Sequence, residues 1–157
     1  MNHVSMRQAL DAYPGETVFA SHITCEKIYG AHRERLINDE CIQALIERDG
    51  VIGLVPVNGF LRSDWNAKKD RSAVTLQDAA NHLDHICQIA GNSLHAAIGT
   101  DFDGGFGLAS IPGDLDSIAD LQTLSGVLFN RGYNETDVEN IFNGNWQRIL
   151  KRLFADA

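Results

Sequence analysis

Two histidines and an aspartate lie where metal chemistry could take place. His3 is near the start of the sequence, His22 follows the apolar run 17–21, and Asp101 follows the apolar run 93–100. Neutral imidazoles and a carboxylate form an ordinary ligand set for a catalytic zinc ion, or part of the set for two ions. Each residue alone is unremarkable in its position. If the fold brings the three together, the sequence predicts a metal site.

The motif "DFDGG" (101–105) has two interpretations. Asx residues followed by glycine form tight turns through local hydrogen bonds, and the motif taken alone favours this interpretation. The alternative is a metal site at the mouth of a sheet. A calcium-binding EF-hand loop fits less well, because the later oxygen ligands and the closing glutamate are absent.

Two other groups of residues could also do chemistry. His82 and His85 lie three apart on one predicted helix and could form a metal pair, but a helix that covers a sheet does not face the strand ends, so a structural role is favoured. The charged segment "HRERLINDE" (32–40) is typical of a solvated loop. An arginine in this segment could instead bind a substrate carboxylate through two parallel hydrogen bonds.

Alternating strands and helices would position these residues. Apolar runs that are rich in β-formers or hydrophobic throughout predict strands, whereas helical spacing of apolar residues and capping signals predict helices. The strands are expected at 17–21, 51–57 and 93–100, and the helices at 39–50, 75–91 and in two tail segments, 117–132 and 134–154.

This alternation indicates a parallel sheet built from right-handed βαβ units. In such sheets the chemistry lies at the carboxyl ends of the strands, where His22, Asn58 and Asp101 are expected. His3 precedes a helical segment, so it would lie at the end of a preceding strand whose body is missing. Gly132 and Gly144 are expected to interrupt the helices of the tail.

Composition excludes several classes of protein. A chain of 157 residues supports one sizeable core, and a net charge of −8 argues against nucleic acid or an anionic membrane as partner. We find no apolar run of about 18 residues and no signal-peptide pattern. The three cysteines, without CxxC spacing, predict reduced and buried thiols in a cytoplasmic protein.

Four segments resemble one known family. The SH, R…DE, HLDHI, GTDFDG and GN-W-R motifs, taken in order, are similar to those of the membrane (renal) dipeptidase family of zinc peptidases. The resemblance covers nearly the whole chain, in the segments 18–61, 81–91, 98–105 and 128–150.

The resemblance implies a (β/α)8 TIM-type barrel that hydrolyses dipeptides at a two-zinc centre bridged by water or hydroxide. It places the two histidine ligands of one zinc on His3 and His22. It places an aspartate on Asp101, which would bind the other zinc and take the proton from the attacking water. Asp103 would then be a structural member of the turn.

The arginine that binds the substrate carboxylate has two candidates. Counting back from "DE" gives Arg35, and counting forward from His22 gives Arg33. We prefer Arg35, because an insertion in the preceding loop is easier than one inside the helix start. The serine or asparagine that usually follows the SH motif is replaced by Ile23 and the family's Arg-Asn pair is absent, which leaves the substrate preference open.

Two parts of the family's site have no counterpart in the sequence: the His-x-Asp of the first strand and the bridging glutamate. A (β/α)8 barrel takes about 250 residues. We therefore expect an α/β fold in which residues 1–157 are a single partial domain, the C-terminal half of the barrel with its C-terminal helices, from a truncated or split chain. Its site would hold one zinc ion or none, and its peptidase activity would be low or absent.

Two functions follow. The first is a zinc metallodipeptidase, or its C-terminal half, acting on dipeptides. The alternative is a non-catalytic half-barrel module that associates with a partner chain, or with itself, through open sheet edges. A third interpretation, that the last two helices read DNA as a helix-turn-helix, is disfavoured by the net charge of −8.

Overall fold

Three parallel strands form the centre of the molecule. The computed structural model describes residues 2–155, so residues 1, 156 and 157 of the expected domain lie outside the described part. The sheet order is β1-β2-β3, with β1 at Phe19–Ile23, β2 at Val51–Leu54 and β3 at Ala96–Ile98. The predicted α/β fold with parallel βα units is confirmed. All three strands are shorter than predicted or shifted, and His22 lies inside β1 rather than after it.

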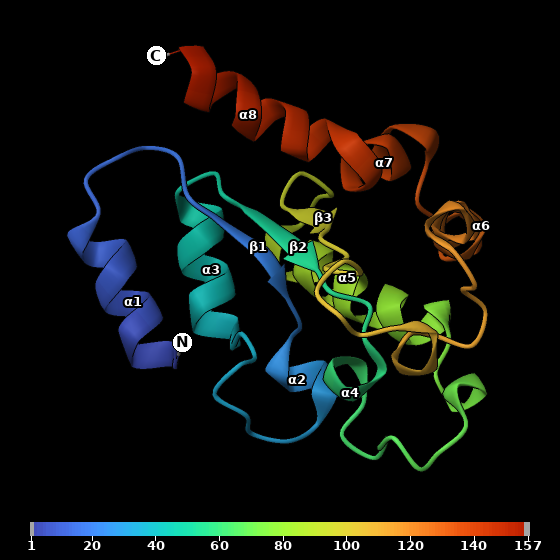
Figure 1. The fold of residues 1–157 in the computed structure, drawn as a ribbon. Helices are drawn as coiled ribbons and strands as arrows, with labels where there is room; N and C mark the ends of the chain where they lie inside the picture. Colours follow the sequence, from blue (N-terminus) through green and yellow to red (C-terminus); the bar gives the residue numbers. More distant parts are fainter. Residues whose placement is uncertain (1, 156–157) are drawn as a thin grey trace.

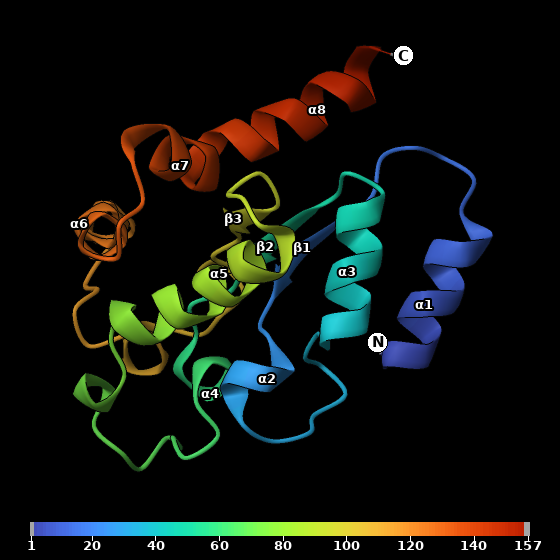
Figure 2. The same ribbon diagram turned by 180° about the vertical axis from the view of Figure 1, so that it is seen from behind.

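Helices surround the sheet (Figure 1). α3 and α5 pack on one face, α1 lies outside α3, and α8 crosses on the other side, as the view from behind also shows (Figure 2). The helices are α1 (His3–Ala12), α2 (Glu26–Tyr29), α3 (Asp39–Glu47), α4 (Asn58–Leu61), α5 (Leu76–Ala90), α6 (Thr123–Asn130), α7 (Glu135–Glu139) and α8 (Asn145–Ala155). Short 3-10 turns lie at η1 (Arg71–Ala73), η2 (Leu108–Ser110) and η3 (Ile118–Gln122), and η4 (Asn140–Gly144) is a π-helical turn.

Local capping signals determine where α5 starts and stops. The Thr75 side chain accepts a hydrogen bond from the backbone N–H of Gln77, and the Asp78 carboxylate accepts one from the backbone N–H of Thr75. Gly91 ends the helix in the left-handed conformation, with φ of 70°. The capping box predicted from Thr75 and Asp78 is confirmed, and it marks the start of α5.

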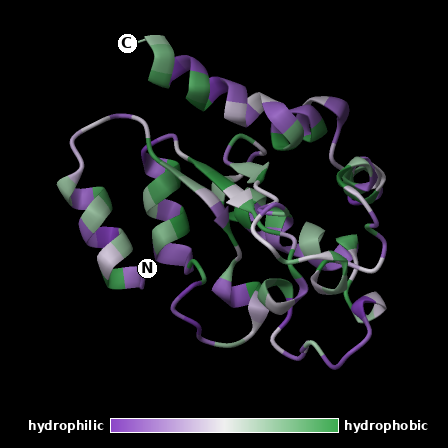
Figure 3. Ribbon diagram, viewed as in Figure 1, coloured by the Kyte–Doolittle hydropathy of each residue, from purple (hydrophilic) through white to green (hydrophobic). Residues whose placement is uncertain are grey.

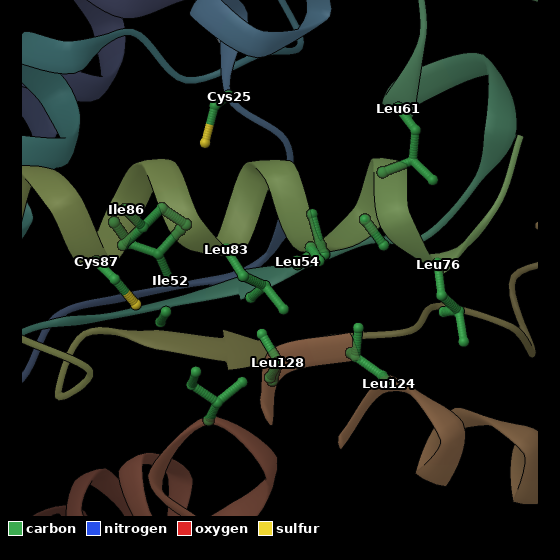
Figure 4. Close-up of a cluster of buried hydrophobic side chains, with 14 of the residues drawn as sticks. Cys25, Ile52, Leu54, Leu61, Leu76, Leu83, Ile86, Cys87, Leu124 and Leu128 are labelled. Atoms are coloured by element: carbon green, nitrogen blue, oxygen red, sulfur yellow. The ribbon is translucent and has the colours of Figure 1, made fainter. Parts of the chain in front are cut away.

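The main core lies between the sheet and α5. Ile52 and Leu54 of β2 meet Leu83 and Ile86 of α5, and all four side chains are almost fully buried (Figure 4). Burial of each such side chain stabilises the fold by about 1.5–3 kcal/mol. The hydropathy colouring shows a similar pattern, with β2 mostly green at the centre and purple at the end of β1 and along much of the outer loops (Figure 3).

Hydrogen bonds from its first residues hold α8 against β3 and against the loops that precede β2 and β3. The buried Asn145 amide donates to the carbonyl oxygens of Ser93 and Ala96, each at 2.8 Å, and the Trp146 indole donates to the Ile98 carbonyl at 2.8 Å. Arg148 donates to the Asp49 carboxylate at 2.7 Å. These bonds give the "GN-W-R" motif a structural role.

The expectation that Gly144 separates two helices is wrong. The chain runs from α7 through the π-helical turn η4 into α8 without an interruption. A π turn is a locally widened helical turn, so the helix continues through Gly144 instead of ending there. The same continuity removes the turn that a helix-turn-helix requires, and Arg148 and Arg152 both pair with Asp49.

All three cysteines are free and buried, as predicted. Burial raises the pKa of the Cys25 thiol, and it raises the pKa of the Cys87 thiol to about 11, so these side chains are un-ionised packing residues. Among residues 2–155, no helix combines the length and apolar character that crossing a membrane requires.

Candidate metal centre at the carboxyl edge of the sheet

A bulge near the end of β1 orients His22. The register between β1 and β2 shifts between Ala20 and Ile23, so Ser21 and His22 form the irregular step. The Ser21 hydroxyl lies 2.7 Å from Nδ1 of His22. A bulge of this kind redirects a side chain at a sheet edge. Here it directs Nε2 of His22 toward the loop that follows β3, while Nδ1 is occupied by Ser21.

Two glycines make this bulge sterically allowed. A Cβ atom on Gly53 would lie 2.2 Å from the carbonyl oxygen of Ser21, and one on Gly99 would lie 1.8 Å from the same oxygen. Real Cβ atoms do not approach so closely, so any other residue at either position would force the strands apart. The conformation of β1 around His22 therefore depends on residues of β2 and of the segment after β3.

The "DFDGG" segment forms a turn that presents Asp101. Asp101 has a positive φ of 52°, which aspartate tolerates better than most residues, and its carbonyl accepts the backbone N–H of Gly104 at 2.9 Å. A Cβ on Gly104 would lie only 2.6 Å from Oδ1 of Asp101. Gly105 continues the turn with φ of 86°, and Asp103 lies exposed within it. The segment is thus a tight turn that also holds a carboxylate in place.

The two side chains meet across the sheet edge. Nε2 of His22 lies 3.8 Å from Oδ2 of Asp101, and the side chains are 42% and 26% exposed. Two ligands bound to one zinc ion at about 2.0–2.2 Å in tetrahedral geometry lie roughly 3.4 Å apart. The pair therefore fits one metal ion after a movement of a few tenths of an ångström, and it remains accessible to a substrate.

His3 lies in a different environment. It is the first residue of α1, where Asn2 accepts the backbone N–H of Ser5 as the helix cap. Nε2 of His3 lies 2.9 Å from the carbonyl oxygen of Leu36 and 3.1 Å from Oε2 of Glu26. The structure thus brings His22 and Asp101 together but places His3 beside another carboxylate, and the role of His3 as their third ligand stays a prediction.

The two arginines have different surroundings. Arg35 and His22 both line a cavity of about 660 Å³ between α1 and β1. The Arg35 guanidinium lies over the Phe60 ring, 4.7 Å from its centroid, and makes no hydrogen bond or ion pair within residues 2–155. Arg33 instead donates to the carbonyl of Gly59 at 3.0 Å. Within residues 2–155, the N–H groups of the Arg35 guanidinium are therefore unbonded, whereas Arg33 uses one of its own.

The loops after β2 and β3 are tied together behind this edge. Asn58, expected at the end of the second strand, is completely buried, and its amide donates to the Ile111 carbonyl at 3.0 Å. The rings of Phe60 and Phe106 pack edge to face, with centroids 5.8 Å apart. Asn58 thus supports the edge from within rather than facing it.

His82 and His85 do not form a metal pair. His82 is buried, its Nδ1 accepts the backbone N–H of Cys25 at 3.0 Å, and its Nε2 lies 3.0 Å from the carbonyl of Leu61. Burial lowers the pKa of His82 to about 4, so the ring is neutral. Nε2 of His85 lies 2.7 Å from Oδ1 of Asp39. The favoured structural interpretation of this pair agrees with these contacts.

A second group of potential metal ligands has no signal in the sequence. Within residues 2–155, the cluster of three or more potential metal ligands is His3, Glu26 and His32. These residues come from the starts of α1 and α2 and from the loop after α2, and they have no motif spacing. Only the folded chain brings them together.

Comparison with known proteins shows which family the sequence of this chain matches. A family model described as membrane dipeptidase (peptidase family M19) matches residues 1–155. An uncharacterized protein in the pqqA 5' region of Klebsiella pneumoniae is 31% identical over 120 residues, which are 76% of this chain and 41% of that protein. Dipeptidase aclJ of Aspergillus oryzae is 28% identical over 116 residues, 74% of this chain and 25% of that protein.

The fold has a close match among solved structures. A metallopeptidase from Rhodobacter sphaeroides, liganded with a phosphinate mimic of the dipeptide L-Ala-D-Ala, aligns with a TM-score of 0.80 and 24% identity. The alignment covers 97% of this chain and 40% of that one. The chain therefore spans less than half the length of the proteins it matches, and its fold corresponds to part of theirs.

Proposed function

The chain belongs to the membrane dipeptidase family, and from this premise we propose that it supplies His22, Asp101 and Arg35 to a metal-dependent site for dipeptide hydrolysis. The observation that carries the proposal is the approach of His22 Nε2 to Asp101 Oδ2 at 3.8 Å, beside the cavity that Arg35 lines. We propose zinc as the metal, because imidazole and carboxylate are both common zinc ligands. His3 remains the proposed third ligand.

A metal bound at this edge supplies Lewis acidity for attack on a peptide carbonyl. Asp101 has two roles in the proposal, since one carboxylate oxygen faces His22 while the other can accept the proton that the attacking water loses. Gly104 keeps that carboxylate in place by leaving room for Oδ1. Ser21 holds the His22 ring from its other nitrogen, which favours one orientation of the imidazole.

Arg35 is the proposed anchor for the carboxylate of the dipeptide. Its planar guanidinium matches a carboxylate with two parallel hydrogen bonds. The Phe60 ring supports the guanidinium by a cation–π contact and leaves its N–H groups for the substrate. Arg33, whose guanidinium also lies near Phe60 at 5.3 Å, is already bonded to Gly59 and is the natural control.

Calorimetric titration of the zinc-loaded chain with a dipeptide, and with the same dipeptide amidated at its carboxyl end, tests this proposal. We expect the free carboxylate to bind more tightly, and Arg35→Ala to weaken its binding at least tenfold, as loss of a charged hydrogen bond of about 1.5–3 kcal/mol implies. Arg33→Ala should bind as the wild type does. Equal affinity for the two peptides, or an effect of Arg33→Ala alone, would contradict the proposal.

Turnover by the 157-residue chain alone is expected to be low or absent. The described residues bring two donors together at the edge, whereas catalytic zinc sites use three protein ligands. Robust hydrolysis of dipeptides by the purified chain would show that two donors suffice or that His3 joins them.

The open edge of β1 supports the alternative, an association module. In the part of the chain that the structure describes, β1 pairs only with β2, and Phe19 on this edge is 46% exposed. An unpaired strand edge favours pairing with another chain. Sedimentation measurements over a range of concentrations test this, because association through β1 should be weakened by Ala20→Pro, which removes one N–H from the strand. The three buried free cysteines support a cytoplasmic location.

A further inference from the structure

We propose that α8 carries a surface through which two copies of this chain form a symmetric dimer. This α8 patch consists of Leu150, Leu153 and Phe154 of α8 and of Phe19 at the start of β1. It differs from the open edge of β1, because its groups are apolar side chains rather than backbone N–H and C=O groups. The inference rests neither on the proposed dipeptidase function nor on the proposed pairing through β1.

The sheet covers only part of the apolar face of α8. Ile149 is buried against β2 and β3, whereas Leu150, Leu153 and Phe154 are 47%, 40% and 74% exposed. Residues three and four apart share one face of a helix, so these three side chains form a single stripe. In both ribbon views the C-terminal end of α8 projects away from the rest of the described chain (Figures 1 and 2). This stripe therefore remains in solvent.

Phe19 extends the stripe onto the sheet. Its ring packs edge to face on the Trp146 ring, with centroids 5.8 Å apart, and the residue is 46% exposed. Trp146 lies four residues before Leu150 and seven before Leu153, so the three side chains lie on the same side of α8. The α8 patch is thus continuous from the first residue of β1 to the end of α8. A groove of about 490 Å³ along its outer side is lined by residues of α8 alone.

The exposed area of the α8 patch suits a dimer. Because an aromatic side chain has about 150–250 Å² of surface, the exposed fractions of the four residues leave about 400 Å² of apolar surface on each copy. The largest apolar patch on a typical monomer is about 300–600 Å² and often marks an interaction site. A standard interface buries about 1,600 Å² in total, of which about 900 Å² is non-polar. Two α8 patches supply about 800 Å², which is close to that amount.

The distribution of charge favours a second copy at this surface over other faces. The chain has a net charge of −8, so two copies repel each other in most orientations. The segment 145–155 contains no acidic residue, and Arg148 and Arg152 both pair with Asp49. Lys151 lies about 100° around the helix from Leu150, so it falls at the rim of the α8 patch. Two copies that meet through α8 therefore bring few like charges together.

A twofold axis would let each α8 patch cover the other. In such a dimer the same residues face each other from both copies, and an apolar stripe on a helix is complementary to itself. The α8 patch lies at the amino ends of the strands, since Phe19 begins β1 and Asn145 donates to the Ser93 carbonyl before β3. His22 and Asp101 lie at the other end of the sheet. Dimer formation therefore leaves the carboxyl edge accessible.

Sedimentation velocity of the purified chain at several concentrations tests the dimer. We expect the wild type to shift from monomer to dimer as the concentration rises. Leu150→Glu places a charge within the α8 patch and should weaken dimerisation at least about 30-fold, as expected for a central interface residue. Phe154→Ser, a second variant, should also weaken it. The matched control is Phe129→Glu in α6, because Phe129 is 45% exposed outside the patch, and it should dimerise as the wild type does.

Oxidative cross-linking of Leu150→Cys tests the twofold arrangement. A residue near a twofold axis meets the same residue of the other copy, so this variant should form a disulfide-linked dimer faster than Phe129→Cys. The three native cysteines are buried, so the new thiol is the one that reacts. Equal rates for the two variants would contradict a symmetric contact through α8.

Ala20→Pro separates this dimer from pairing through β1. The substitution removes an N–H from the strand edge and should leave the α8 dimer intact. A monomer at every concentration, a dimer that persists in Leu150→Glu and Phe154→Ser, or a dimer that is lost in Ala20→Pro would overturn the inference. Circular dichroism spectra that match the wild type check that the variants fold. Dipeptide binding by Leu150→Glu should equal that of the wild type, so the dipeptidase proposal fails or succeeds in a different measurement.

Discussion

The imidazoles of His82 and His22 show how one residue type serves two different regions. His82 lies in the interior, fully buried, with both ring nitrogens bonded to backbone groups of other segments. His22 lies at the sheet edge with its side chain 42% exposed, and within residues 2–155 its nitrogens have Ser21 and Asp101 as polar neighbours. The interior ring joins three segments of the fold, whereas the edge ring keeps one nitrogen for a ligand.

The two environments predict different responses to mutation, in stability for His82 and in metal binding for His22. A change at His82 should reduce stability because it leaves backbone groups without partners in the interior. A change at the side chain of His22 should affect metal binding and leave stability almost unchanged, because solvent replaces what is lost. A change that disturbs the backbone around His22 should reduce stability, because the bulge there packs closely against Gly53 and Gly99.

The largest effect is expected for Gly99→Ala. The new Cβ would lie 1.8 Å from the carbonyl oxygen of Ser21, so the strands must separate or the bulge must change. We expect a loss of about 4 kcal/mol or more in the free energy of unfolding, in the range that marks severe steric conflict. Urea denaturation measures it.

Gly126→Ala is the matched control for this substitution. Gly126 lies within α6, and a Cβ there would meet no atom within 4 Å. Alanine should therefore stabilise the helix by up to about 1 kcal/mol. If Gly99→Ala were as stable as Gly126→Ala, the tight bulge at the edge would not exist in solution.

His82→Ala is expected to cost about 3 kcal/mol. The substitution leaves the N–H of Cys25 and the carbonyl of Leu61 without partners and opens a cavity beside α5. The free energy of unfolding at pH 7.5 gives the magnitude. His85→Ala provides the comparison, because it removes an ion pair with the half-exposed Asp39 and should cost less than about 1 kcal/mol.

Stability should also depend on pH through His82. Its pKa is about 4 in the folded chain and 6.5 as the ordinary value, so between these values the unfolded chain binds a proton that the folded chain does not. Stability therefore falls as the pH drops from about 6.5 to about 4, by up to about 3 kcal/mol, and this contribution is constant below that range. In His82→Gln the contribution disappears, so the stability difference between the two proteins should shrink as the pH falls. A difference that stays constant from pH 7 to pH 4 would mean that His82 is not buried and neutral.

The smallest effect on stability is expected for His22→Ala and Asp101→Asn. Both side chains are partly exposed, and their mutual contact at 3.8 Å is worth little in solvent. Unfolding free energies should stay within about 0.5 kcal/mol of the wild type. A loss comparable to that of His82→Ala would make His22 a structural residue and end the contrast between the two regions.

Local signals predicted the elements, and long-range packing decided the details of the site. The Thr75–Asp78 capping box and the hydrophobic strands were readable because the residues that cause them are near in sequence. The bulge at His22 depends on Gly53 of β2 and on Gly99 after β3, which are far away in the sequence, and the continuous helix through Gly144 depends on a π turn.

The residues of the candidate site were also predictable to different degrees. His22 and Asp101 were found because strand ends of a parallel sheet meet at one edge, and the structure places them within 3.8 Å. The position of His3 was not predictable from that rule, because it depends on the Asn2 cap and on Glu26 and the Leu36 carbonyl. The Glu26–His32 contact has no sequence pattern at all.

Whether His22 and Asp101 share one metal ion is tested most directly by anomalous diffraction from crystals of the chain grown with zinc. The predicted result is a zinc peak within about 2.2 Å of both Nε2 of His22 and a carboxylate oxygen of Asp101. The peak should vanish in Asp101→Asn crystals. Zinc-saturated crystals with no peak at this edge, or with a peak that touches neither side chain, would contradict the proposed centre.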